Sequence, residues 1–94
     1  MARYITLLRF TEQGARNIKE SPARAQAFKN EAQKMGVTVE GQYWTVGRHD
    51  GTLILSGEEK VVLRCLAQLA AQGNVRTQSM QAFTADELQD ILPR

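Results

Sequence analysis

Hydrophobic positions along the chain change their spacing several times, and each change marks an expected element. Runs rich in β-branched and aromatic residues, without breakers, predict strands. Apolar positions three and four residues apart predict helices between these strands. The expected strands cover residues 3–10, 37–47, 52–55 and 74–83.

The first expected helix begins at Ser21-Pro22 and ends at Gly36. A serine can cap free backbone N–H groups, and proline suits the first turn, where its missing N–H costs nothing. Glycine ends a helix because it tolerates the left-handed backbone of the cap. The preceding residues 11–20 are expected to form a loop with room for one irregular helical turn.

Two capping boxes mark the starts of further helices. Ser56 with Glu59, and Thr84 with Glu87, have the spacing in which side chain and backbone bond reciprocally. The helix after Ser56 is expected to end at Gly73, and a short C-terminal helix follows Thr84.

The order of elements predicts the fold class. Asp50-Gly51 between the second and third strands predicts a hairpin with a type I′ turn, which needs positive φ. The order βαββαβ is that of a ferredoxin-like fold. We therefore expect an α+β chain with a four-stranded antiparallel sheet, a short C-terminal helix and a single domain over residues 1–94.

The first and third expected strands, which are central in this fold, are apolar on both faces. In residues 3–10, Ile5 and Leu7 lie on one face and Tyr4 and Leu8 on the other. Near-continuous apolar runs are typical of strands covered on both sides. Because two helices cover only one face, we expect a homodimer joined sheet to sheet. The alternative is that the C-terminal helix folds across the open face.

Composition narrows the function classes. The chain has 94 residues, 43% of them hydrophobic, and a formal net charge of +2. A single cysteine excludes an internal disulfide, and one His with one Cys excludes a structural zinc site within one chain. We therefore expect no metal and no cofactor. No apolar run has the ~18 residues of a membrane span, so no membrane partner is expected.

The expected strands also bear on the cellular location of the protein and on whether it binds nucleic acid. The N-terminus begins directly as a strand and lacks a signal-peptide profile, which favours the cytoplasm. RNA-recognition domains share this topology but place stacking aromatic residues on the central strands. Residues 52–55 carry none, so no nucleic-acid partner is expected.

His49 and Asp50 are the candidate catalytic residues. His49 has the only side chain whose ordinary pKa lies near neutrality, and Asp50 beside it is a candidate base or ligand anchor. The structural alternatives are that His49 is an ordinary turn residue and that the Asp50 carboxylate bonds nearby backbone N–H groups. Cys65 lies on an apolar helix stripe and is expected to be a small core residue.

Further residues are candidates for binding a small ligand. Three kinds of group would contribute to ligand binding. They are polar side chains in a cavity enclosed by the sheets, an aromatic ring that stacks on a planar ligand, and groups that bind an anion. Asn17 with Ser21 and Arg24 would meet the anion; the structural alternative, which we favour, is that they serve helix capping and surface charge. The candidates are Tyr4, Thr6, Asn17, Tyr43, Trp44, Arg76 and Thr77.

Several stretches resemble one known family, the GYD domain family, from Tyr4 to about Leu92. They are residues 10–19 with Ser21-Pro22, Tyr43-Trp44-Thr45, Gly47-Arg48-His49-Asp50, and Gly73 to Thr77 leading into Ala82-Phe83-Thr84. The resemblance implies ferredoxin-like subunits paired as a dimeric α+β barrel, with an uncharacterised activity. In the family's Gly-x-Tyr-Asp run, His49 replaces the tyrosine, so a role that needs a phenol would be lost or altered here.

These observations favour a small homo-oligomeric ligand-binding or sensing module, with itself and a small molecule as partners. The alternative is a cofactor-independent enzyme, like the monooxygenases or isomerases of the dimeric α+β barrel type. His49 or Asp50 would then be the base. A third hypothesis is an assembly protein that adds subunits through its edge strands.

Overall fold

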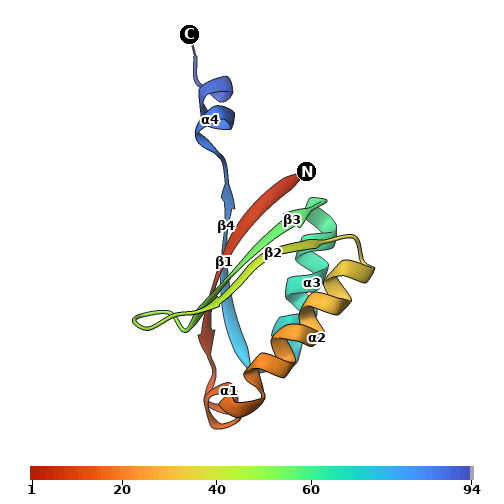
Figure 1. Cartoon of the computed structure of the whole chain (residues 1–94), viewed down its shortest axis with the longest axis vertical. Helices are drawn as coiled ribbons and strands as arrows, with labels where there is room; N and C mark the ends of the chain where they lie inside the picture. Colours follow the sequence, from red (N-terminus) through yellow and green to blue (C-terminus); the bar gives the residue numbers. More distant parts are fainter. Residues whose placement is uncertain (94) are drawn as a thin grey trace.

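A computed structural model describes residues 1–93, and its strands and long helices follow the expected order (Figure 1). Its elements are β1 (Ala2–Phe10), α1 (Glu12–Arg16), the 3-10 helix η1 (Ile18–Glu20), α2 (Ser21–Lys34), β2 (Thr38–Trp44), β3 (Gly51–Gly57), α3 (Glu59–Ala71), β4 (Val75–Ala82) and α4 (Ala85–Ile91).

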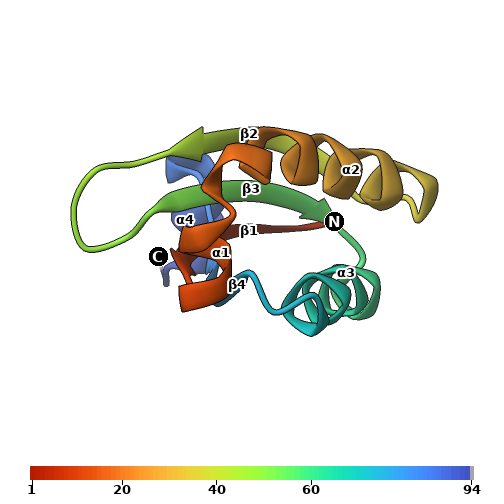
Figure 2. The ribbon, with the colours of Figure 1, turned by 90° about the horizontal axis from the view of Figure 1, so that it is seen from below.

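The four strands form one antiparallel sheet in the order β2-β3-β1-β4. The expectation that the first and third strands are central is confirmed. Both long helices lie on the same face, α2 beside β2 and α3 beside β4 (Figure 2). The fold is α+β and compatible with the ferredoxin-like class.

The side chains of β1 alternate between the two faces of the sheet, and the strand register shows which face each one takes. Thr6 pairs with Leu53, and Tyr4 pairs with Leu55, so these residues face the helices. The core lies between this face and the helices, and Leu55 is 0% exposed. The side chains buried there are Ala32, Val37, Val39, Leu53, Leu55, Val62 and Cys65.

The other face of the sheet is uncovered and partly apolar. Ile5 and Ile54 pair across β1 and β3 at its centre, and both are only half-buried. Tyr43 and Met80 on the outer strands are 60% and 45% exposed. Below, "the open face" means this surface, formed by Ile5, Leu7, Tyr43, Ile54 and Met80.

The C-terminal helix does not cover the open face. In Figure 1, α4 lies beyond the end of β4 instead of against the sheet. Its apolar residues Leu88, Ile91 and Leu92 are 49%, 61% and 53% exposed. The alternative in which the chain's own tail closes this face is therefore wrong.

Two expected helix caps are corrected. Ser21 is the first residue of α2 and makes no capping hydrogen bond; its hydroxyl instead accepts from Trp44 Nε1 at 2.9 Å. In α3 the cap is Glu58, whose side chain accepts from the Val61 N–H, and not Ser56. The Ser21 hydroxyl is taken by a tertiary partner, Trp44, and at α3 the neighbouring Glu58 supplies the capping acceptor in place of Ser56.

The connection between β2 and β3 is longer than the expected tight turn. Strand β2 ends at Trp44, and β3 already begins at Gly51. Neither Asp50 nor Gly51 has a positive φ, so a type I′ turn is wrong here. The loop closes through Thr45, whose N–H donates to the Asp50 carbonyl at 2.9 Å.

Residues 11–20 are more regular than a loop. Thr11 caps α1 by accepting from the Gly14 N–H, and η1 continues directly into α2. The Thr11 hydroxyl also donates to the Gly73 carbonyl at 2.6 Å. This contact between distant segments fixes the position of α1.

Candidate functional site

A cleft opens between the helices and the sheet, at the end of the molecule that carries α1. It is formed by the start of α2, the end of α3, and the adjoining ends of all four strands. About 600 Å³ there is free of protein atoms, part of it open to solvent. Its apolar walls come from Leu8, Phe10, Phe28, Trp44, Leu53 and Leu69.

Two local features shape this cleft. Gly51 contributes no side chain to it, and a Cβ there would lie 2.9 Å from the Tyr43 carbonyl oxygen. At the rim, the bond from Trp44 Nε1 to Ser21 Oγ ties the end of β2 to the start of α2. Ser21 is only 8% exposed, so little water competes for its hydroxyl. The bond to this hydroxyl therefore holds the indole in place against the cleft.

Several polar side chains of the cleft are bonded to backbone. Gln42 Nε2 donates to the Ala25 carbonyl at 2.9 Å. Asp50 Oδ2 accepts from the Phe10 N–H at 2.8 Å. These bonds fix the side chains and occupy part of their hydrogen-bonding capacity.

Arg24 differs from these polar groups. Its Nη1 donates to the Asn17 carbonyl at 2.8 Å, but its Nη2 is buried and no protein acceptor reaches it. Within residues 1–93, no ion pair joins Arg24 to a carboxylate. A guanidinium is a cationic group that only donates hydrogen bonds. The cleft therefore contains a cationic donor that the protein does not satisfy.

Metal-ligating side chains do not cluster around this cleft or elsewhere in residues 1–93. Nowhere in that part of the chain do three His, Cys, Asp or Glu side chains gather as a metal ion would require. None of the helices described is both long and apolar enough to span a bilayer.

Comparison with known proteins identifies the family. Residues 4–92 match the GYD domain, which is nearly the full chain. The chain belongs to the GYD domain family. The resemblance carried by the motifs from Phe10 to Thr84 is thereby confirmed.

One curated relative of this GYD domain is similar over almost its whole length. It is the "Glutamine synthetase and cystathionine beta-lyase binding protein" of Thermus thermophilus, 29% identical over 90 residues. The match covers 94% of this chain and 95% of the relative. No solved structure matches the chain significantly.

The cleft of this GYD domain gathers five of the residues singled out by the sequence, namely Ser21, Arg24, Tyr43, Trp44 and Asp50. By register, the Tyr43 side chain itself lies on the open face. The Asp50 carboxylate bonds a backbone N–H, as the structural interpretation expected, although the donor is Phe10 on another strand. Trp44 lines the cleft while remaining 51% exposed. An aromatic wall of this kind can pack against a planar ligand.

Three other candidates face the helix layer, away from the cleft lining and the open face. Thr6 is 0% exposed, and its hydroxyl shares a 2.8 Å hydrogen bond with Ser79 Oγ. Tyr4 and Thr77 lie on the same side of the sheet by register. They therefore do not line a cavity between two sheets, because strand alternation turns them toward the helices.

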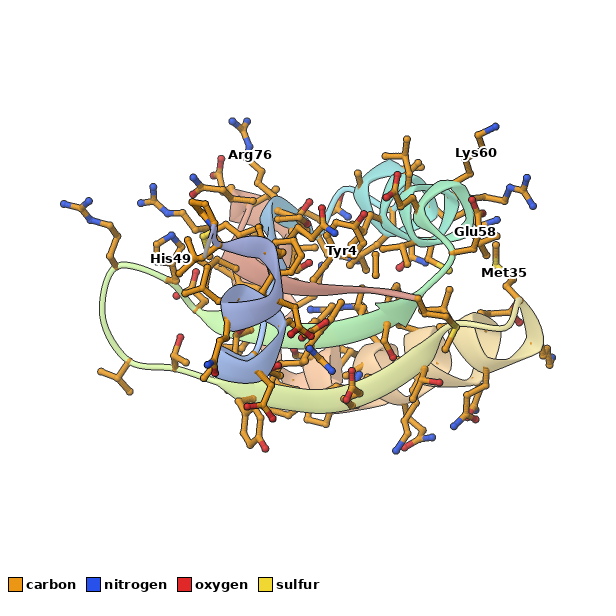
Figure 3. All side chains as sticks on the ribbon, turned by 90° about the horizontal axis from the view of Figure 1, so that it is seen from above. Tyr4, Met35, His49, Glu58, Lys60 and Arg76 are labelled. Atoms are coloured by element: carbon orange, nitrogen blue, oxygen red, sulfur yellow. The ribbon has the colours of Figure 1, made fainter. Side chains whose placement is uncertain are left out.

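The remaining candidates are spread over the surface. Figure 3 shows His49 in the β2–β3 loop and Arg76 at the start of β4, at separate places. Asn17 is exposed, and its carbonyl holds Arg24. The structure therefore does not join His49 with Arg76 or Asn17 in one site.

Two pKa shifts describe groups near the core. Burial raises the pKa of the Tyr4 phenol, and the carboxylates of Glu59 and Glu58 raise it further. Burial also raises the pKa of the Cys65 thiol, against a smaller lowering by Arg64. Both groups stay protonated at neutral pH. Because Cys65 is buried in the core, its interpretation as a small core residue is confirmed.

Most of the cleft walls carry no distinctive signal in the sequence. Phe28 and Leu69 lie on apolar helix stripes, which predict core packing equally well. In the sequence, Arg24 stands out only as one member of a candidate anion-binding group with Asn17 and Ser21. The signal that distinguishes it is the unsatisfied Nη2, which is visible only in three dimensions.

Proposed function

We propose that this GYD domain protein is a homo-oligomeric binding module whose cleft takes a small molecule and which acts on a protein partner. The observation that carries the proposal is the cleft itself. Its walls are apolar, and its polar groups Gln42 and Asp50 are held by backbone bonds. Binding sites for small molecules combine an apolar lining with a few fixed polar groups in this way.

The surface of the single chain supports homo-oligomerisation. Its accessible area is 6655 Å², whereas a monomer of this mass exposes about 5400 Å². The difference exceeds the ~800 Å² that each partner buries in a standard interface. A second copy that covers the open face and the apolar side of α4 would remove this excess.

The relative supports a protein partner. Its printed name makes it a binding protein for glutamine synthetase and cystathionine beta-lyase. By analogy, this chain binds a metabolic enzyme. The first partner to test is the glutamine synthetase of the organism that produces this chain. The β2–β3 loop offers a contact, because Val46 is fully exposed there.

The enzymatic alternative has weaker support. Asp50 reaches the cleft but uses one carboxylate oxygen to hold the Phe10 N–H. His49 is not among the residues that line the cleft. A base and a partner acid in one pocket, which cofactor-independent proton transfer needs, have no counterpart among the described residues of the cleft.

A thermal-shift screen of amino acids, organic acids and aromatic metabolites tests the proposed function. We expect at least one compound to raise the melting temperature by a few degrees. Ala25→Leu, which adds side-chain volume in the cleft, should lose this response while still folding. Gln26→Leu on the exposed side of the same helix is the matched control. If no compound stabilises the wild-type protein at millimolar concentration, the ligand-binding proposal fails.

A further inference from the structure

The cleft contains one cationic group that the protein leaves unsatisfied. Arg24 Nη2 is shut off from solvent, while Nη1 of the same guanidinium is fixed by the Asn17 carbonyl at 2.8 Å. A buried polar group without a partner is costly, and the cost is larger for a charged group. Such a group beside a cleft points to a ligand that completes its hydrogen bonds.

The missing partner must be an acceptor. A guanidinium only donates hydrogen bonds, and its planar geometry suits a carboxylate or a phosphate. The only carboxylate on the cleft lining is that of Asp50, which accepts from the Phe10 N–H and makes no ion pair with Arg24. The required acceptor is therefore not supplied by the described chain.

The walls specify the rest of the ligand. Phe28 on α2 and Leu69 on α3 both contribute to the lining, with Leu53 from β3 between the two helices. Apolar walls gain free energy by removing apolar ligand surface from water, which a bare inorganic anion does not offer. The Trp44 indole N–H is already bonded to Ser21, so the ring offers its apolar surface.

We infer that the cleft binds a small organic carboxylate with an apolar body, its carboxylate on the Arg24 guanidinium and its body between Phe28, Leu69 and Trp44. This inference rests on the proposed ligand-binding function and names the chemical class of the ligand. It assigns Arg24 as the residue that selects for charge. The apolar walls select for the body.

The test compares acids with their uncharged counterparts. Phenylacetate, indole-3-acetate and octanoate are each titrated beside the corresponding primary amide into ¹⁵N-labelled full-length protein, with acetate and inorganic phosphate as further probes. We expect the acids to shift amide signals of the cleft-lining residues and to bind at least about tenfold more tightly than the amides, because a charge-assisted bond is lost. Acetate and phosphate should bind more weakly than the acids.

Variants separate the charge from the fold. Arg24→Gln should remove the preference for acid over amide, whereas Arg64→Gln, which removes an exposed arginine from α3, should keep it. If Arg24→Gln proves too unstable, Ala25→Leu keeps the guanidinium and should weaken the binding of acid and amide alike.

Each contrary outcome has its own meaning. Equal binding of acid and amide, or unchanged acid preference in Arg24→Gln, overturns the inference but leaves the proposed ligand-binding function standing. Phosphate or acetate binding as tightly as phenylacetate overturns the apolar part of the inference. No shift at the cleft with any probe overturns both the inference and the ligand-binding proposal.

Discussion

Single residues fix how closely the segments of this chain approach one another. Gly14 in α1 is buried against the backbone of Asn74, at the start of the segment that leads into β4. Thr11 makes two contacts with the same segment, through its N–H to the Asn74 carbonyl and its hydroxyl to the Gly73 carbonyl. This junction forms one end of the cleft, because Asn74 also lines it.

Gly14→Ala tests this junction. A Cβ at Gly14 would overlap the Asn74 carbonyl oxygen, which is backbone and cannot simply rotate away. We expect the substitution to lower the free energy of unfolding by about 1–3 kcal/mol, as overpacking does, measured by urea denaturation. Ala15→Ser, at the exposed neighbouring position, should change it little. An unchanged midpoint in Gly14→Ala would show that α1 does not pack here.

At the level of the elements, a sequence pattern predicts the structure correctly when the residues that form the bonds are close together in the chain. The capping box of Thr84 and Glu87 was predicted and is confirmed, because its reciprocal bonds join two residues only three positions apart. The antiparallel pairing of β2 with β3 was predicted and is confirmed, but the type I′ turn at Asp50-Gly51 is wrong, and the Asp50 carboxylate bonds Phe10, 40 positions away. Cleft residues on separate helices, such as Arg24 and Leu69, likewise converge only in the fold.

Helix α4 should respond to acid through Glu87. The Thr84 backbone N–H, the Thr84 hydroxyl and Arg3 lower the pKa of Glu87 below its ordinary value of 4.5. A lowered pKa in the folded state means that the ionised carboxylate stabilises the helix above about pH 4.5. This stabilisation is lost as the pH falls through the folded-state value.

Amide hydrogen exchange in α4 measures this effect. We expect Leu88 and Asp90 to exchange slowly at pH 7 and to lose protection, after correction for intrinsic rates, at pH 3. Glu87→Ala should show low protection at both pH values, and Asp90→Asn, outside the capping box, should behave as the wild type. Equal protection factors in Glu87→Ala and wild type at pH 7 would contradict the capping role.

At the scale of the whole molecule, the single chain is elongated and incompletely covered. Its radius of gyration is 14.2 Å, whereas a compact domain of 100 residues has about 13 Å. The extension comes from α4, which continues beyond β4 (Figure 1). The near-continuous apolar runs of β1 and β3 predicted a second apolar sheet face, which the two long helices leave uncovered in the single chain. The path of α4 was not predictable, since no local signal says where a terminal helix packs.

The central claim is that a second copy covers the open face, and static light scattering with size-exclusion chromatography tests it most directly. Ile54 lies at the centre of this face, paired with Ile5 and only half-buried in the single chain. At micromolar concentration we expect the wild-type protein to have at least twice the chain mass of 10.5 kDa. Ile54→Asp should shift it to the mass of one folded chain, and Gln26→Asp on the outer side of α2 should not. A wild-type protein that has the mass of a single chain would contradict the account.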